Sequence, residues 1–136
     1  MSGSARVQHC ALSPGCVVSG AVEGSILSPG VIIEKGASVK DSIIMHDSVV
    51  RQGARIERAV IDKEILVGEN AVIGLGDPGT ANVKFPDHVY SGLTVIGKKA
   101  SIPAGAKIGT NCIIHGAVKE RDFPAAGIGD GGTLEK

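Results

Sequence analysis

The sequence predicts an all-β fold, a single-stranded parallel β-helix whose coils contain about 17–18 residues each. The composition gives the first indication, because the chain is rich in valine and isoleucine and contains 20 Gly, as is typical of short strands and turns. The second is an ungapped 17-residue repeat, and the third is a stricter six-residue period downstream. With so few aromatic side chains, the core must consist of small branched residues.

The 17-residue repeat covers three segments, 25–41, 42–58 and 59–75. Three positions of each segment are always large and aliphatic: Leu27/Ile44/Ile61, Ile33/Val50/Val67 and Val39/Ile56/Ile73. A period near six with one inward aliphatic residue per side describes a triangular coil of three short strands. Successive coils then pair as parallel strands about 4.8 Å apart.

Two further columns of the alignment support this register. One column holds residue types that accept a left-handed turn conformation: Gly36/Gly53/Asn70. Opposite charges also fall one coil apart, as exposed ladders prefer: Glu34/Arg51, Lys40/Glu57 and Asp41/Arg58. Every coil is therefore expected to turn at the same places.

The repeats divide the chain into five parts. Residues 1–10 form an N-terminal segment, of which the first three are left out of the fold prediction, and residues 11–75 form coils, beginning with a shortened coil at 11–24. Residues 76–92 hold two prolines and no period, which predicts either a functional or partner-binding excursion or a plain surface loop.

The last two parts differ in periodicity. Residues 93–118 form further coils, with an isoleucine at every sixth position: Ile96, Ile102, Ile108 and Ile114. Residues 119–136 show no period and are predicted to be loop, with Phe123 packing over the open end of the β-helix.

Charge and composition exclude several classes of protein. Fourteen Lys+Arg balance fourteen Asp+Glu, which argues against a nucleic-acid partner. No apolar run approaches the roughly 20 residues of a membrane span or forms a signal peptide, so we expect a cytoplasmic protein without a membrane partner. The three cysteines include no C-x-x-C pair, so neither a disulfide framework nor a metal site is predicted.

The histidines show no catalytic spacing, because none of the four lies four residues from another and no HExxH motif occurs. We therefore assign no catalytic residue to this chain. One local feature indicates anion binding: Lys63 falls in the column of His46, one strand spacing away on the outer face, with Arg58 close in sequence. Lysine and arginine suit phosphate oxygens. The alternative is a solvated face neutralised by acidic neighbours: Glu57, Asp62 and Glu64.

The strict six-residue period, in which a small residue follows each isoleucine by four positions, resembles that of hexapeptide-repeat proteins. This resemblance implies left-handed coils, although parallel crossovers are right-handed in about 98% of cases. It also raises a second hypothesis, a hexapeptide-repeat acyltransferase that uses acetyl coenzyme A, with His115 or His46 as the base between neighbouring subunits.

Four stretches closely resemble the C-terminal domain of glucose-1-phosphate adenylyltransferases: GCVVSG (15–20), VEGSILSPGV (22–31), DSIIM (41–45) and ERAVIDK (57–63). The resemblance covers roughly residues 5–75. That family makes ADP-glucose from ATP and glucose 1-phosphate for glycogen or starch synthesis. Its catalytic residues, with Mg²⁺ and ATP, lie in an N-terminal domain whose glycine-rich loop does not occur here. The resemblance therefore implies that this chain alone is not catalytic and binds no cofactor.

In that family the β-helix supports the oligomer and, packed on the catalytic domain, helps to bind anionic effectors. The resemblance implies that Lys63, which ends the VIDK motif, contributes to such a site, and His46 and Arg58 are added on geometry alone. We expect a homo-oligomer, a contact with its own catalytic domain or subunit, and a phosphorylated small-molecule effector. A third hypothesis, the tail of another sugar-nucleotide pyrophosphorylase, stays open because substrate choice lies in the catalytic domain.

Overall fold

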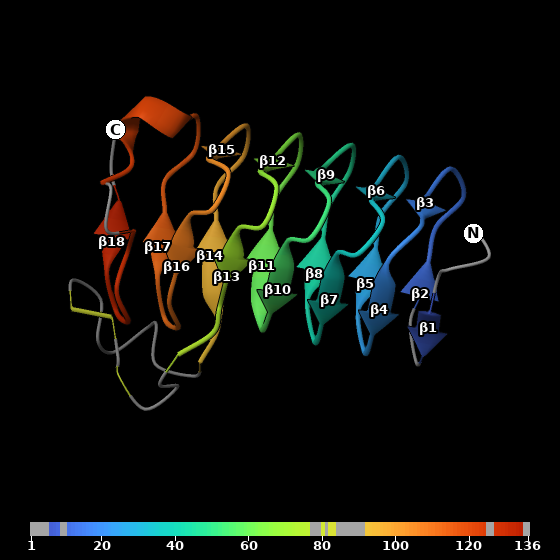
Figure 1. Cartoon of the computed structure of the whole chain (residues 1–136), viewed down its shortest axis with the longest axis horizontal. Helices are drawn as coiled ribbons and strands as arrows, with labels where there is room; N and C mark the ends of the chain where they lie inside the picture. Colours follow the sequence, from blue (N-terminus) through green and yellow to red (C-terminus); the bar gives the residue numbers. More distant parts are fainter. Residues whose placement is uncertain are drawn as a thin grey trace.

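The computed structural model describes residues 6–8, 11–76, 80, 82–83, 92–124 and 127–134. These residues form a left-handed parallel β-helix of stacked three-sided coils, as the sequence predicts (Figure 1). Every strand pairing in the described ranges is parallel and joins a strand to its equivalent one coil away. From residue 25 to residue 75, the inward face of the strands carries the branched residues that the repeat identified.

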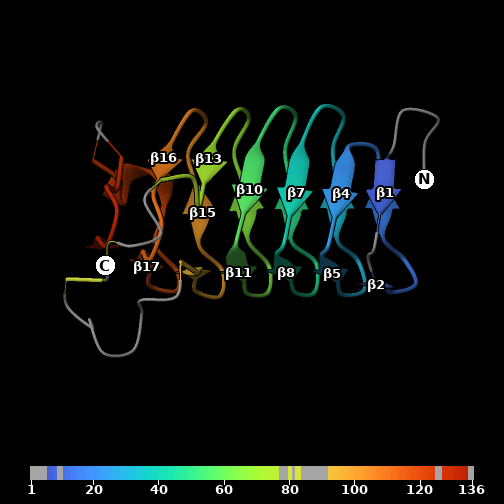
Figure 2. The same ribbon diagram turned by 90° about the horizontal axis from the view of Figure 1, so that it is seen from below.

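Three sheets form the three sides of the solenoid. Sheet A contains β1 (Arg6–Gln8), β4 (Ala21–Glu23), β7 (Ser38–Lys40), β10 (Arg55–Glu57), β13 (Val72–Ile73) and β16 (Lys107–Ile108). Sheet B contains β2 (Ala11–Leu12), β5 (Ile26–Leu27), β8 (Ile43–Ile44), β11 (Ala59–Ile61), β14 (Thr94–Ile96), β17 (Ile113–Ile114) and β18 (Thr133–Leu134). Sheet C contains β3 (Val17–Val18), β6 (Ile32–Ile33), β9 (Val49–Val50), β12 (Leu66–Val67) and β15 (Ser101–Ile102). Figure 2 shows the strands of sheet A in one row along the solenoid.

The register confirms the predicted columns. Leu27 pairs with Ile44, Ile44 with Ile61 and Ile61 with Ile96, and each of these side chains is fully buried. The first coil is shortened, but it is one residue longer than the predicted segment 11–24, because Ala11 pairs with Ile26. The parallel pairing also includes β1, upstream of residue 11.

The corners explain why glycine and asparagine recur at fixed positions. Gly36, Gly53 and Asn70 have φ angles of 78°, 75° and 58°, in the left-handed region that the sequence column predicts. The charge columns have the expected register, since Lys40 pairs with Glu57 across β7 and β10. These charged side chains also bond elsewhere: the Glu34 carboxylate accepts a hydrogen bond from the backbone N–H of Gln52 at 3.0 Å.

The excursion adds about one coil of chain between two neighbouring strands, since Ala59 on β11 pairs with Thr94 on β14. Of the excursion, residues 76, 80, 82–83 and 92 are described, and its other residues lie outside the described part. Asn82 is buried, and its Nδ2 donates to Asn111 O at 3.0 Å and to Thr133 Oγ1 at 3.0 Å. The described part of the excursion therefore packs against the last coils.

The C-terminal tail is a correction to the sequence prediction of loop. After the 3-10 helix η1 (Glu120–Asp122), Ile128 forms a parallel bridge to Ile108, and β18 pairs with β17. Residues 127–134 thus continue the solenoid, with a step from Ile113 to Thr133 that is longer than the repeat. The longer step hides this coil from a search for a six-residue period. Phe123 is half-buried and packs against the core, and its predicted place over the open end of the β-helix stays a prediction.

The core is one continuous column of buried aliphatic side chains from Val18 to Ile128. Alanine and cysteine fill the narrow positions between the branched residues, for example Ala54, Ala71 and Cys112. Across the described residues, no helix combines the length and the apolar character that a membrane span requires.

Candidate functional site

The predicted anion-binding residues lie at one edge of the solenoid, where each coil turns from sheet B to sheet C. We call this edge the B–C corner; it consists of residues 28–31, 45–48, 62–65 and 97–100. The Glu64 amide donates to His46 O at 2.9 Å, which sets the turn containing Lys63 directly on the turn containing His46. Both side chains are exposed. The structure therefore brings His46 and Lys63 together, one strand spacing apart.

A second lysine, which the sequence analysis missed, extends this column. The Lys99 amide donates to Lys63 O at 3.0 Å, so Lys98 occupies on its coil the position that Lys63 has on the preceding one. Lys98 is exposed. The excursion lies between the two lysines in the sequence and conceals the register. The similarity of Thr94-Val-Ile-Gly97 to Ala59-Val-Ile-Asp62 is the sequence signal that could have revealed the register of the two coils.

The charges of the B–C corner are mixed. Lys99 Nζ lies 3.8 Å from Glu64 Oε2 between two exposed side chains, and Lys119 Nζ donates to Lys99 O at 3.2 Å. Asp62 Oδ1 accepts a hydrogen bond from the backbone amide of Lys63 at 2.7 Å. Exposed pairs of this kind contribute little stability. The corner can thus offer the ammonium groups of Lys63 and Lys98 to an anion, beside carboxylates that reduce its net charge.

Arg58 lies away from this corner. It precedes β11 whereas Lys63 follows it, and the five intervening steps of extended chain span about 16 Å. Its guanidinium forms an ion pair with Glu57 at 2.6 Å and donates to Gly74 O at 3.4 Å. Closeness in sequence therefore did not translate into closeness in space, because a strand separates the two corners.

His115, the other histidine that the structure describes, does not occupy this column. His115 follows β17 and is exposed, and its amide donates to Leu134 O at 2.9 Å. His9 and His88 lie outside the described residues. Within the described ranges no three His, Cys, Asp or Glu side chains gather where they could hold a metal ion.

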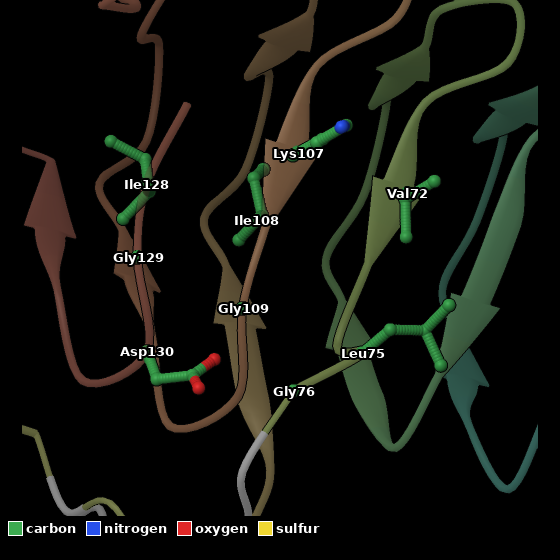
Figure 3. A pocket seen from close by; sticks show the side chains of 9 residues that line it. All are labelled: Val72, Leu75, Gly76, Lys107, Ile108, Gly109, Ile128, Gly129 and Asp130. Carbon is green, nitrogen blue, oxygen red and sulfur yellow. The ribbon is translucent and has the colours of Figure 1, made fainter. Parts of the chain in front are cut away.

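A shallow cavity of about 340 Å³ lies at the opposite edge, where the chain leaves sheet A to enter the excursion. Val72, Leu75 and Ile108 supply apolar lining, and Lys107 and Asp130 supply charge. Figure 3 shows the Asp130 carboxylate turned toward Gly109 while Lys107 extends away from it. Asp130 Oδ1 accepts a hydrogen bond from the Thr110 amide at 3.0 Å. Asp130 thus has a structural role at this turn.

Stacked three-sided coils with an inward aliphatic residue at every sixth position define a hexapeptide-repeat β-helix. The family described as "GlmU-like, C-terminal hexapeptide" matches residues 2–96, and the chain belongs to this family. The match includes the coils that carry His46 and Lys63 and ends at the last residue of β14.

Curated relatives confirm the resemblance to glucose-1-phosphate adenylyltransferases. The chain is 37% identical over 123 residues to the enzyme of that name from Acetivibrio thermocellus, which covers 90% of this chain and 28% of that protein. It is 47% identical over 95 residues to the one from Thermomicrobium roseum, covering 70% of this chain and 22% of that protein. The chain thus spans about a quarter of the length of these relatives.

A solved structure has the same fold. The acetyltransferase domain of PglB from Neisseria gonorrhoeae aligns with a TM-score of 0.63 and 16% sequence identity, over 96% of this chain and 51% of that one. At this identity the likeness concerns the fold alone.

Proposed function

We propose that this chain is the β-helix domain of a glucose-1-phosphate adenylyltransferase, in which it supports the oligomer and binds a phosphorylated effector while catalysis takes place in another domain. The observation that carries this proposal is the 37% identity to an enzyme of that name over 90% of the chain. Mg²⁺ and ATP would belong to the catalytic domain, and the natural partner of the β-helix would be that domain or subunit.

The size of the native polypeptide tests the domain assignment. An immunoblot of extract from the source cells, with antibody raised against this chain, should show a band several times larger than 13.8 kDa. A band at 13.8 kDa would instead favour a free-standing β-helix, either a separate regulatory subunit or an acyltransferase.

The B–C corner supports the effector-binding part of the proposal. Lys63 and Lys98 present two ammonium groups from neighbouring coils, and His46 extends the column by one more coil. Lysine binds phosphate as a point charge, so two lysines about one strand spacing apart suit a phosphorylated small molecule. Arg58 is engaged with Glu57 at the other end of β11, and we therefore give it no main role in this site.

Replacement of Lys63 tests the site directly. Isothermal titration calorimetry of the 136-residue chain with inorganic phosphate and with glucose 6-phosphate should show binding that Lys63→Ala weakens about tenfold, as expected for the loss of one charge-assisted contact. Lys40→Ala is the matched control, because Lys40 is equally an exposed lysine but ends β7 on sheet A.

Three outcomes distinguish the hypotheses. Equal binding by wild type, Lys63→Ala and Lys40→Ala would place the anion elsewhere. Absence of any phosphate or sugar phosphate binding would remove the effector role. Acetyl coenzyme A is titrated in parallel, and binding of that compound together with acetyl transfer would replace this proposal with the acyltransferase.

A further inference from the structure

The three sides of the solenoid differ in the side chains that they present to solvent. On sheet B the outward position of five successive strands is a branched aliphatic residue; we call this set the sheet B stripe, and it comprises Ile26, Ile43, Val60, Val95 and Ile113. Ile26, Ile43 and Val95 are 49%, 39% and 37% exposed, and Val60 and Ile113 are half-buried. The register places the five residues one above another without interruption, over about 19 Å.

Sheet A, in contrast to sheet B, presents charged side chains to solvent. Its outward positions include Arg55 and Lys107, and the strand ends carry a ladder of alternating charge from Glu23 through Lys40 to Glu57. Solvated charge is what a solenoid side that faces water normally shows. A continuous stack of exposed and half-buried isoleucine and valine marks an interaction surface, whereas isolated exposed apolar residues are ordinary.

We infer that the sheet B stripe is the surface through which two copies of this chain pack, face to face about a two-fold axis. This inference names the contact face for the oligomer proposed above and rests on that proposal. A two-fold axis sets each surface against its own copy, so the paired faces must be free of uncompensated charge. The stripe meets this condition because it has no charged member.

The repeat spacing also favours a second copy over an unrelated partner. The stripe places one branched side chain on each coil, about 4.8 Å from the next. A surface with the same spacing and the same side-chain size interdigitates with it over its whole length, and the second copy supplies such a surface. Sheet C is less suitable as the contact face for a second copy, because its outward apolar column is shorter. That column contains Val17, Ile32, Val49 and Leu66 and ends at Ser101.

The size of the face sets the expected strength. Seven strands and one coil side give roughly 500 Å² per copy, so a dimer buries about 1,000 Å² in total, near the lower limit of specific interfaces. Interfaces of this size belong to weak or transient contacts, so we expect reversible dimerisation rather than a permanent dimer.

The experiment is sedimentation equilibrium of the 136-residue chain over a concentration range from low micromolar to several hundred micromolar. Wild type should pass from monomer to dimer within this range. Ile43→Lys should weaken association at least about tenfold, because each dimer then buries two unpaired ammonium groups. Ile32→Lys on sheet C is the matched control, since Ile32 is 37% exposed and Ile43 39%, and it should leave the dimer unchanged.

Circular dichroism melting confirms that each variant is folded. Val95→Lys, three strands along the same stripe from Ile26, replaces Ile43→Lys if that variant melts early. A wild-type chain that stays monomeric at every concentration would overturn both the oligomer proposed above and this inference. Association that survives the sheet B substitutions, or that Ile32→Lys abolishes, would overturn the choice of face and leave the oligomer standing.

Discussion

At the scale of single residues, Cys112 shows how the narrow core treats a polar atom. It is fully buried, and its Sγ donates to Gly129 O at 3.1 Å and to Thr110 O at 3.5 Å. Burial raises the pKa of the Cys112 thiol, because the apolar surroundings disfavour the thiolate. The thiol is therefore a packed donor rather than a reactive group.

This pKa shift predicts a loss of stability in alkaline solution. The folded thiol keeps its proton above the pH at which the unfolded thiol, with a pKa of about 8.5, releases it. The free energy of unfolding should therefore fall as pH rises from about 8.5 toward the higher folded pKa, by at most about 1.4 kcal/mol per pH unit from this group. Urea unfolding of wild type and Cys112→Ser between neutral and alkaline pH measures the difference.

Serine at position 112 keeps a hydrogen-bond donor but removes the titration, so the variant should lack this component of the pH dependence. Cys16→Ser, at a half-buried cysteine, serves as the control and should follow wild type. The same slope in wild type and Cys112→Ser would contradict the prediction.

At the scale of the elements, serine hydroxyls connect successive coils inside the corner between sheets A and B. Ser42 Oγ donates to Lys40 O at 2.8 Å and accepts from the Ala59 amide of the next coil at 3.1 Å. Ser25 Oγ does the same one coil earlier, since it donates to Glu23 O and accepts from the Ser42 amide. These hydroxyls satisfy amides that the strand ladders leave unpaired.

Loss of one such hydroxyl should destabilise the fold without altering its shape. Ser42→Ala removes the acceptor of the buried Ala59 amide, which predicts a decrease in the free energy of unfolding of about 1–3 kcal/mol. Ser38→Ala is the control, because Ser38 is an outward, half-buried residue of β7, and its change should stay within about 0.5 kcal/mol. Urea unfolding at neutral pH provides both values. Equal effects of the two substitutions would contradict a stabilising role of the hydrogen bonds that Ser42 makes between coils.

At the scale of the whole molecule, the excursion bonds to coils far away in sequence. Asn82 Nδ2 donates to the carbonyls of Asn111 and Gly132 and to Thr133 Oγ1, at distances of 3.0–3.2 Å. Asn111 in turn donates to Thr80 O and accepts from the Gly92 amide. These hydrogen bonds stabilise the position of residues 127–134 on the solenoid, in addition to the pairing of β17 with β18.

Because a coil of a solenoid contacts only its neighbours, weakening this network should act locally. Asn82→Asp removes the donor of all three bonds, so amide hydrogen exchange should accelerate at residues 127–134 and stay unchanged at residues 25–75. Hydrogen exchange with mass spectrometry measures both regions. Val83→Ala, at a side chain that is 83% exposed, is the control and should change neither region. Uniform acceleration along the chain would show that the coils do not open independently.

The sequence and the structure agree where the period is intact. From residue 25 to residue 75 every inward column, turn position and charge column predicted from the repeat has the observed register, because a 17-residue repeat leaves one way to stack the coils. The stacking of His46 and Lys63 could be predicted for the same reason.

Agreement fails where the period changes. A fixed 17-residue period locates a residue only where paired strands are 17 residues apart. The number of residues between paired strands differs in the first coil, before Lys98 and before the coil at 127–134. Arg58 was grouped with Lys63 because the two are close in sequence, and the structure shows that the chain between them crosses an entire side of the coil.

The sequence by itself determined the three-sided coil and its core, because inward aliphatic residues about six positions apart are buried together when each coil has three sides. The tertiary structure alone decided which distant residues share a surface. Lys63 and Lys98, or Val60 and Val95, become neighbours only when strands separated by the excursion pair. The physical reason is that burial of apolar side chains acts within each coil and its neighbours. The two proposed binding surfaces instead depend on how many residues separate one strand from its partner in the next coil.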